Sequence, residues 1–420
     1  MAQIHKRFGD SDVKALLKRY VNGEIERKYI EEILGIKRRR FCELVKKYKE
    51  DQDAFTISYK RENPSRKIDK KTEESILAEL KIEKDLIELD DNPIRTYNYS
   101  YIKDRLEQKY HCSASLPTII DRAKRFGFYL KRNKSKAHDR EVVTNYAGEL
   151  VQHDSSHHKW SPYADSKWYL ITSIDDCSRF LLYYNLVEFE TSWTHILALE
   201  DVALIYGLAY SYYFDSHSIF RFVQGRDSFW RKHYKVTDDA DPQVKSILAD
   251  LGIKVRYALS PQAKGKVERP YRWLQDRIVR TCAREGIKDI SDGIKVLKAE
   301  AERYNFRQIH SATGEVPYYR LKRLTSEGKS LFREFTVPAP YLSSKDIFAL
   351  RDTRTINPYR KISFNNLVLP ISKAPIREKV NLRIVPDLAS GMAEIRMWYK
   401  DNLIGIQSAK NEDINIKNFQ

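Results

Sequence analysis

Three carboxylates in this sequence stand at places from which separate elements could bring them together. Glu268 follows a basic, glycine-containing loop and opens an expected helix, while Asp154 and Asp215 each follow an apolar, strand-like run. Three converging carboxylates can hold two divalent cations, and such a pair of cations catalyses phosphoryl transfer at a phosphodiester. Since the chain contains 58 acidic residues, the sequence around each of the three acids has to distinguish it from the others.

The segments around these acids resemble those of one superfamily of recombinases. Pro261-Gln-Ala-Lys-Gly-Lys-Val-Glu268 resembles the P-Q-S/A-x-G-x-V-E segment of the retroviral-integrase superfamily of DDE recombinases. Asp154-Ser-Ser-His157 resembles the D-x-T-H segment of the same superfamily. Asp215-Ser-His-Ser-Ile-Phe220 occupies the place of D-N-G-S-x-F, and it departs from that pattern in the manner of bacterial insertion-sequence transposases of the ISNCY group.

Further matches follow in the expected order along the chain. Trp168 to Arg179 resembles the next strands of these domains, which end in D-x-x-S-R. Downstream, the segments 304–310 and 314–317 resemble the closing signature Y-N-x-x-x-x-H and G-x-x-P. Any one match alone would be weak, but together they span about residues 150–320 and are specific.

The resemblance implies a DDE transposase with an RNase-H-like catalytic domain at 142–325. Such an enzyme binds insertion-sequence ends, cleaves DNA and joins the 3′ ends to target DNA. The resemblance implies that Asp154 bridges two Mg²⁺ or Mn²⁺ ions, and that Asp215 and Glu268 each complete one coordination sphere. It also implies double-stranded DNA as the partner, both transposon ends and target, and a homo-oligomer assembled on that DNA.

The composition favours a nucleic-acid-binding protein of several domains. The 420 residues include 75 Lys and Arg, and the formal net charge is +17, which indicates a polyanionic partner. The hydrophobic content of 42% is sufficient for packed cores. The four cysteines form no CxxC pair, so we expect neither disulfides nor a zinc site. The N-terminus has no apolar signal core and no window approaches a membrane span, so we expect a cytoplasmic protein. The resemblance to bacterial insertion-sequence transposases implies a bacterial, nucleoid-associated one.

Residues 1–55 show helical periodicity and predict a helix-turn-helix domain. Apolar stripes recur at 13–20, 29–34 and 41–48, and Gly35 suits the left-handed cap that would end the second helix. A basic run then opens the third helix, which we expect to enter the major groove of DNA. The candidate contacts are Lys37, Arg38, Arg39 and Arg40. An ordinary helical hairpin with a solvated basic face is the alternative.

Residues 66–140 predict a second helix-turn-helix or winged-helix domain that ends in a basic linker. The stretch 113–127 has the features of a cap, a basic helix and a glycine stop, with Pro117 in the first helical turn. A plain helical spacer is the alternative. The candidate DNA contacts are Arg122, Lys124, Arg125, Lys131 and Arg132.

The remaining sequence completes a multidomain fold class: all-α units, a central α/β RNase-H-like domain and a C-terminal small β-barrel. Within 142–325, β-rich runs alternate with amphipathic helices, which is typical of a mixed α/β sheet. From 334 to 408, short strands separated by Pro and Asn favour an SH3-like barrel, followed by a tail at 409–420.

Several residues near the three acids have competing interpretations. Lys264, Lys266 and Arg272 could grip phosphate or could be solvated surface cations. Asp175 and Asp176 compete for a metal role, although we interpret them as structural acids at a strand end. His157 could approach the scissile phosphate or could be a satisfied strand histidine.

Two alternative functions remain open from the sequence. The chain could be a non-catalytic DNA-binding regulator derived from a transposase, or an RNase-H-like nuclease without joining activity. The presence of all three acids with their flanking segments favours the transposase.

Overall fold

The computed structural model describes residues 4–58, 68–89, 92–131, 143–214, 243–257, 265–365 and 367–414; for Tyr257 and residues 265–270 it describes the backbone alone. The chain divides into two compact units, Met1–Glu73 and Glu74–Gln420.

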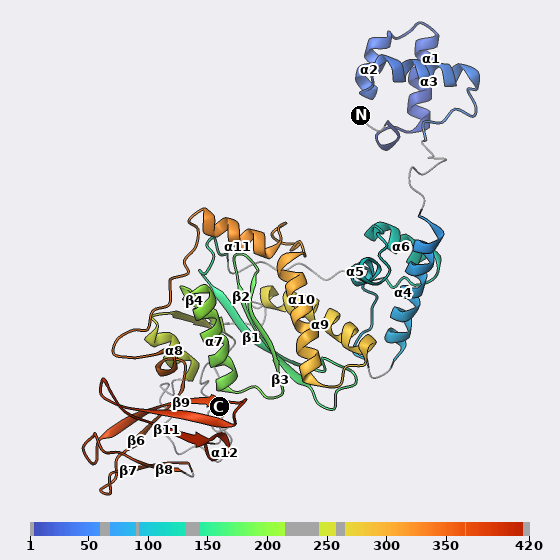
Figure 1. Cartoon of the computed structure of the whole chain (residues 1–420). Coiled ribbons are helices and arrows are strands. Elements are labelled where there is room, and N and C mark those ends of the chain that lie inside the picture. The colour runs from blue at the N-terminus through green and yellow to red at the C-terminus, as the bar shows by residue number, and fades with distance from the viewer. Residues whose placement is uncertain are drawn as a thin grey trace, which may run out of the picture. The chain divides into compact units, whose positions relative to one another are not determined.

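The N-terminal unit is a bundle of short helices (Figure 1). After a 3₁₀ turn, η1 (Ile4–Lys6), it consists of α1 (Asp10–Val21), α2 (Arg27–Leu34) and α3 (Arg38–Glu50). Gly35 ends α2 with φ 64°, and the N–H of Ile36 donates to the carbonyl of Glu31 at 2.9 Å. This is the glycine cap that the sequence predicts.

The short helix α2 buries less of its predicted apolar stripe than expected. Ile30 and Leu34 are fully buried, but Tyr29 and Ile33 are exposed. Residues four apart lie on one face of a helix, and this eight-residue helix has only that one face against the bundle. The apolar stripe predicted at 29–34 is therefore buried only at Ile30 and Leu34.

The second unit opens with α4 (Lys70–Glu88), α5 (Tyr99–Lys109) and α6 (Leu116–Arg125), of which α4 begins a few residues before the boundary. The hydroxyl of Ser115 accepts a hydrogen bond from the N–H of Thr118, Pro117 lies in the first turn of α6, and Gly127 follows α6 with φ 78°. The predicted sequence of cap, basic helix and glycine stop is confirmed.

A mixed five-stranded sheet forms the centre of the second unit. Its strands are β1 (Val151–His158), β2 (Trp168–Asp175), β3 (Leu181–Val187), β4 (Ser211–Phe214) and β5 (Lys254–Tyr257), in the order β3-β2-β1-β4-β5. The first three pair antiparallel, whereas β4 pairs parallel to both β1 and β5. The predicted mixed α/β sheet is confirmed.

Helices cover both faces of this sheet. The side chains of α7 (Ser192–Tyr206) and α8 (Gln243–Asp250) share a core with Val151 and Leu182. Those of α9 (Gly265–Glu285) and α10 (Ile290–Phe306) share a separate core with Leu170 and Ile174. Alternate residues of β2 therefore serve the α9 face and the α7 face, as the two-residue period of a strand requires. A further helix, α11 (Pro317–Ser326), contacts α10.

The C-terminal region consists mainly of strands. After η4 (Ser344–Asp346), β6 (Leu350–Thr355), β9 (Lys379–Asp387), β10 (Met392–Tyr399) and β11 (Asn402–Lys410) form one sheet, β7 (Lys361–Phe364) and β8 (Leu367–Pro370) form another, and α12 (Asn411–Ile414) follows. The predicted strands are confirmed. The described residues form two sheets without a closed ring of paired strands, so the SH3-like barrel is not confirmed.

Candidate active site and nucleic-acid interface

Asp154 lies in the middle of the central strand of the sheet. The sequence predicts that it follows a strand ending at 153, but β1 continues to His158 and pairs in register with β2 along its whole length. Residues 155–158 are polar, so the hydrophobicity pattern does not predict that the strand continues through them. Backbone pairing with β2 holds them in the strand. The strand end predicted at 153 is therefore wrong, and Asp154 sits on a rigid strand opposite Thr172.

The residue that faces Asp154 on the neighbouring strand connects the site to α9. The hydroxyl of Thr172 donates to the hydroxyl of Tyr271, in α9, at 2.8 Å. Residues paired directly across two strands point to the same face of the sheet, so Asp154 and Thr172 share the α9 face. Burial, and then the negative charge of Asp154, raise the pKa of Tyr271 well above its ordinary value, so its phenol stays protonated.

Of the other two acids, the structure describes only the backbone of Glu268. Asp215 follows Phe214, the last residue of β4, and lies outside the described residues. Glu268 lies within α9, which begins at Gly265 rather than at the predicted residue 268, and its side chain is not described. Within the described ranges, no three His, Cys, Asp or Glu side chains come together as a metal-binding group.

The competing acids Asp175 and Asp176 have structural roles. Asp175 is fully buried and accepts hydrogen bonds from the N–H of Gly148, at 2.8 Å, and from both the N–H and the hydroxyl of Ser178. Burial raises the pKa of its carboxyl. Asp176 accepts from Arg179, at 2.9 Å, and from Thr144 and Gln152. Both carboxylates are occupied in closing the turn between β2 and β3, as the sequence predicts.

A buried chain of polar groups on the α7 face of β1 was not anticipated from the sequence. The ring of His153 contacts the hydroxyl of Ser173 and the ring of His195, each at 2.8 Å, and His195 reaches Glu190 at 3.0 Å. Glu190 in turn accepts a hydrogen bond from Ser155. Burial, and then the neighbouring His195, lower the pKa of His153 well below its ordinary value. These hydrogen bonds hold His153 and Ser155, the two residues that flank Asp154 in β1.

The other histidine considered at the site is engaged with an aromatic ring. His157 stacks on Tyr169 with ring centroids 4.1 Å apart and interplanar angle 10°. This contact agrees with the interpretation of His157 as a histidine that packs within the strand.

The basic residues predicted in α3 are exposed. Lys37, Arg38, Arg39 and Arg40 all face solvent, although Arg39 and Arg40 each pair with Glu43, at 3.4 and 3.0 Å. Exposed pairs of this kind contribute little stability and can exchange their carboxylate for a phosphate.

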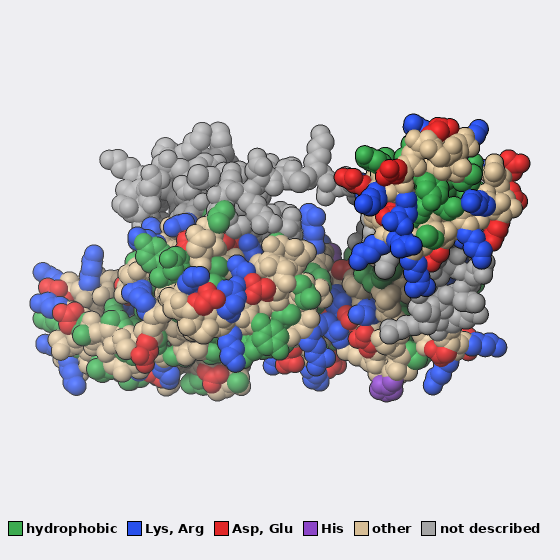
Figure 2. Space-filling model, turned by 90° about the horizontal axis from the view of Figure 1, so that it is seen from above, with side chains coloured by type: hydrophobic (Ala, Val, Ile, Leu, Met, Phe, Trp, Pro, Cys, Tyr) green, Lys and Arg blue, Asp and Glu red, His purple; other side chains and the backbone are tan. Residues whose placement is uncertain are grey.

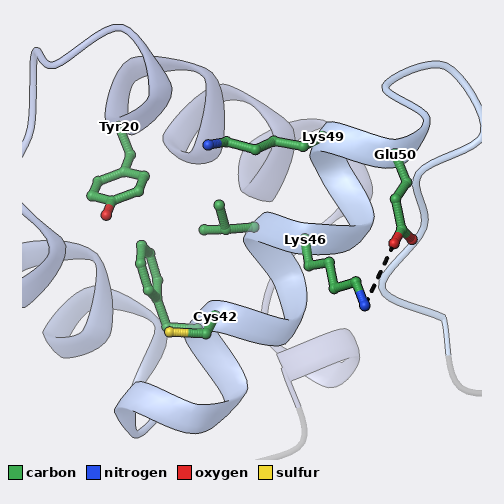
Figure 3. A pocket seen from close by; sticks show the side chains of 7 residues that line it. Tyr20, Cys42, Lys46, Lys49 and Glu50 are labelled. Carbon is green, nitrogen blue, oxygen red and sulfur yellow. Dashed lines mark ion pairs between the residues drawn. The ribbon is translucent and has the colours of Figure 1, made fainter.

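Further along α3, three more exposed residues continue this surface. Cys42, Lys46 and Lys49 follow Arg39 at intervals of three or four residues, which places all four on one helical face. Figure 3 shows Cys42, Lys46 and Lys49 beside a hollow of about 420 Å³ between Tyr20 and α3, with Lys46 paired to Glu50 at 3.9 Å. The spacing of these residues is a helical signal in the sequence, and the predicted contacts at 37–40 cover only the first part of this face.

The predicted contacts around α6 differ in exposure. Lys124 is exposed and lies over the ring of Tyr129, while Arg125 is exposed and pairs with Asp121 at 3.1 Å. Arg122 is only partly exposed and donates to Asp121 at 2.7 Å, so it is the least available of the three.

The remaining predicted cations are exposed or outside the described side chains. Lys131 and Arg272 are exposed. Arg132 and Lys264 lie outside the described residues, and the side chain of Lys266 is not described.

Charge on the visible surface is mixed in sign. Figure 2 shows Lys and Arg side chains over much of the face in view, with carboxylates interspersed between them. The net charge of +17 therefore attracts a polyanion in general. A specific binding face would have to be formed by the exposed cations of particular helices, such as α3 and α6.

No described helix is long and apolar enough to cross a lipid bilayer.

Two curated proteins of similar sequence are transposases. Over 187 residues the chain is 33% identical to "Putative transposase y4bF" of Sinorhizobium fredii, which covers 43% of this chain and 38% of that protein. The chain is similar to transposases. Over 271 residues it is 26% identical to "Transposase for insertion sequence IS1202" of Streptococcus pneumoniae, covering 63% of this chain and 50% of that protein. The resemblance to transposases predicted from the motifs is confirmed, and the chain matches at most half the length of these relatives.

Similar solved structures are retroviral integrase catalytic cores. The core of BIV integrase has a TM-score of 0.31 at 16% identity and covers 43% of this chain and 98% of that chain. The HTLV-2 integrase core, solved in complex with magnesium, has a TM-score of 0.31 at 14% identity and covers 41% and 96%. No protein-family model matches the chain.

Proposed function

We propose that this chain is a DDE transposase that binds DNA ends, cleaves them and joins the 3′ ends to target DNA. The observation that carries the proposal is the contact of α9, which bears Glu268, with the strand pair that bears Asp154. That contact is the hydrogen bond from Thr172 to Tyr271. The similarity to two transposases supports the reaction class.

Helical and strand geometry support the convergence of the three acids. Glu268 stands three residues before Tyr271 in α9, and side chains three apart share one face of a helix. That face is the one on which Tyr271 meets the sheet beside Asp154. Asp215 is bonded to the last residue of β4, which runs parallel to β1, with Gln152 paired to Tyr213.

The chemistry follows from the type of donors. Carboxylate oxygens suit hard cations such as Mg²⁺ and Mn²⁺. Two such ions, bound by Asp154, Asp215 and Glu268, would supply activation of water or a 3′-hydroxyl and stabilisation of the leaving oxygen. The sheet and the paired histidines hold Asp154 in one place, and the Tyr271–Thr172 contact holds α9. Arg272, one turn beyond Glu268, would hold a DNA phosphate, as would Lys264 and Lys266.

The helical units would supply binding to DNA. We assign end recognition to residues 1–55, through α3, and to residues 66–140, through α6. The exposed cations of both helices support this assignment. We further propose that the protein acts as a homo-oligomer on two DNA ends, in a bacterial cytoplasm at the nucleoid.

Strand transfer by variants of the full chain tests the proposal. Asp154→Asn, Asp215→Asn and Glu268→Gln should each abolish Mg²⁺-dependent cleavage and joining while leaving DNA binding intact. Asp165→Asn, which changes an exposed carboxylate between β1 and β2, is the matched control and should retain activity. Full activity in any of the three variants would remove that residue from the site. Wild-type nicking without joined products would favour a nuclease, and binding without either would favour a regulator.

A further inference from the structure

A buried network of charged side chains joins the helical unit α4–α6 to α9. Glu79 and Glu83 of α4 and Arg277 and Arg280 of α9 are all at most 1% exposed. Such burial is rare for these residue types unless they are paired. The network lies far along α9 from Glu268 and belongs to neither the proposed metal site nor the DNA-facing surface.

The contacts between α4 and α9 pair the charged groups in one specific arrangement. Arg280 donates to Glu83, to the backbone carbonyl of Thr96, and to Asp276 at 2.8 and 3.0 Å. Arg284 donates to Glu79 at 2.6 Å and to Glu83 at 2.7 Å. Planar guanidinium groups bind carboxylates through directional pairs of bonds, so these contacts fix orientation as well as distance.

A second set of contacts attaches α5 to the same helix. Arg277 donates to Asp104 of α5 at 2.7 Å and to Glu300 of α10 at 2.6 Å. The hydroxyl groups of Tyr101 and Thr281 lie 2.8 Å apart. The unit is therefore attached through two of its helices to the helix that bears Glu268.

These contacts make the junction rigid. Breaking one buried ion pair by removing a single partner costs about 3–5 kcal/mol, because it strands an uncompensated charge. A slide or rotation of α4 along α9 would break several such pairs together. An apolar interface of the same size would tolerate a slide much better, since apolar contacts are not directional.

We propose that this network makes α4–α6 a fixed spacer that sets which phosphate is cut. The inference rests on the proposed function, in which α6 holds end DNA and α9 carries one catalytic carboxylate. Because α6 packs on α5, DNA bound by Lys124 and Arg125 lies at one distance and one rotation from the catalytic carboxylates. Cleavage would then occur at a constant number of base pairs from the sequence that α6 binds.

Altered spacing in the DNA tests this directly with the full chain. The probe is a duplex of the DNA flanking this reading frame, and the α6 site is the part of the wild-type footprint that a Lys124→Ala/Arg125→Ala variant no longer protects. Insertions of 5 or 10 base pairs are placed between that site and the cleaved phosphate. A 10-base-pair insertion restores the rotation but adds about 34 Å.

Both insertions should lower cleavage at the displaced phosphate at least about 100-fold, since misplacement by about 1 Å can already cost that much. Any remaining cut should fall at the original distance from the α6 site. Cleavage of the displaced phosphate within about 3-fold of the unaltered duplex, for either insertion, would overturn the spacer while leaving the proposed function standing. No cleavage of the unaltered duplex would overturn the proposed function and this inference with it.

A paired substitution tests the network itself. Arg280→Met/Glu83→Met removes both partners of one ion pair. Asp276 still accepts a hydrogen bond from Asn98, and Arg284 still donates to Glu79. Replacement of a buried pair by apolar groups is often neutral for stability, so this variant should fold. It should bind the end like the wild type but cleave it at least about 10-fold more slowly, because a shift of about 1 Å can cost more than that. The looser junction should also spread the cuts to phosphates one step away, about 3.4 Å along the strand.

The matched control is Lys84→Met/Glu88→Met, which removes an exposed ion pair in the same helix, α4. It should leave both the rate and the position of cleavage unchanged. Identical rate and position in Arg280→Met/Glu83→Met and in this control would overturn the role of the network, and folding of both is checked by their melting temperatures.

Discussion

Removal of the Tyr271 hydroxyl tests how α9 is held beside Asp154. Tyr271 is 8% exposed and Thr172 is 2% exposed, and their hydroxyl groups are 2.8 Å apart. Tyr271→Phe leaves the Thr172 hydroxyl buried without its acceptor, which should lower the free energy of unfolding by about 1–3 kcal/mol. Thr172→Val removes the stranded hydroxyl, so Tyr271→Phe/Thr172→Val should cost less than the sum of the single changes by about 1 kcal/mol.

Urea unfolding followed by tryptophan fluorescence measures these differences, and strand transfer measures their effect on the site. Tyr304→Phe is the matched control, because the Tyr304 hydroxyl is also buried but has no hydrogen-bond partner among the described residues. It should be neutral or stabilising. We also expect Tyr271→Phe to slow cleavage by up to about 100-fold, the effect of a shift of about 1 Å at the site. Additive single changes, or equal effects of Tyr271→Phe and Tyr304→Phe, would refute the proposed anchoring of α9.

Three further outcomes are expected. A positive φ imposes a strain of about 1–2 kcal/mol on alanine. Gly207→Ala should destabilise the fold by more than this strain, because its Cβ would lie 2.4 Å from the Arg333 carbonyl oxygen. Gly252→Ala has open space around its Cβ and should cost only the strain, and thermal melting measures both changes. Asp346 is buried, which opposes its charge, but hydrogen bonds from Arg396 and Trp398 lower its pKa. Its contribution to stability should therefore be complete above about pH 4 and be lost progressively as the pH falls further. Urea unfolding of wild type and Asp346→Asn at pH 7 and pH 3 measures this difference, which should be smaller at pH 3. Arg39→Ala and Lys46→Ala should each reduce the slope of log affinity for DNA against log salt concentration by about 1, whereas Lys84→Ala should not change it.

Much of the fold could be predicted because local signals were strong. The apolar run at 168–174 forms the buried strand β2, and the glycine at position 35 adopts the left-handed conformation that ends α2. The extension of β1 through Asp154 to His158 could not be predicted in the same way. Those residues are polar, and their strand conformation depends on pairing with β2, a contact that is distant in the sequence.

The polar interior was also beyond sequence patterns. Arg277, Arg280 and Arg284 look like one more basic stripe on an amphipathic helix, which usually faces solvent. Only tertiary packing brings acids from α4 and α5 to them. The contact of His153 with His195 likewise joins residues that are far apart in the chain and that carry no shared motif.

The positions of Mn²⁺ ions in a crystal of the full chain bound to its DNA end test the central claim most directly. Anomalous scattering should locate two ions about 4 Å apart, with Asp154 contacting both and Asp215 and Glu268 contacting one each at about 2.0–2.6 Å. Ions bound instead at Asp175 and Asp176, or a DNA-bound complex in which Asp154 contacts no ion, would contradict the account.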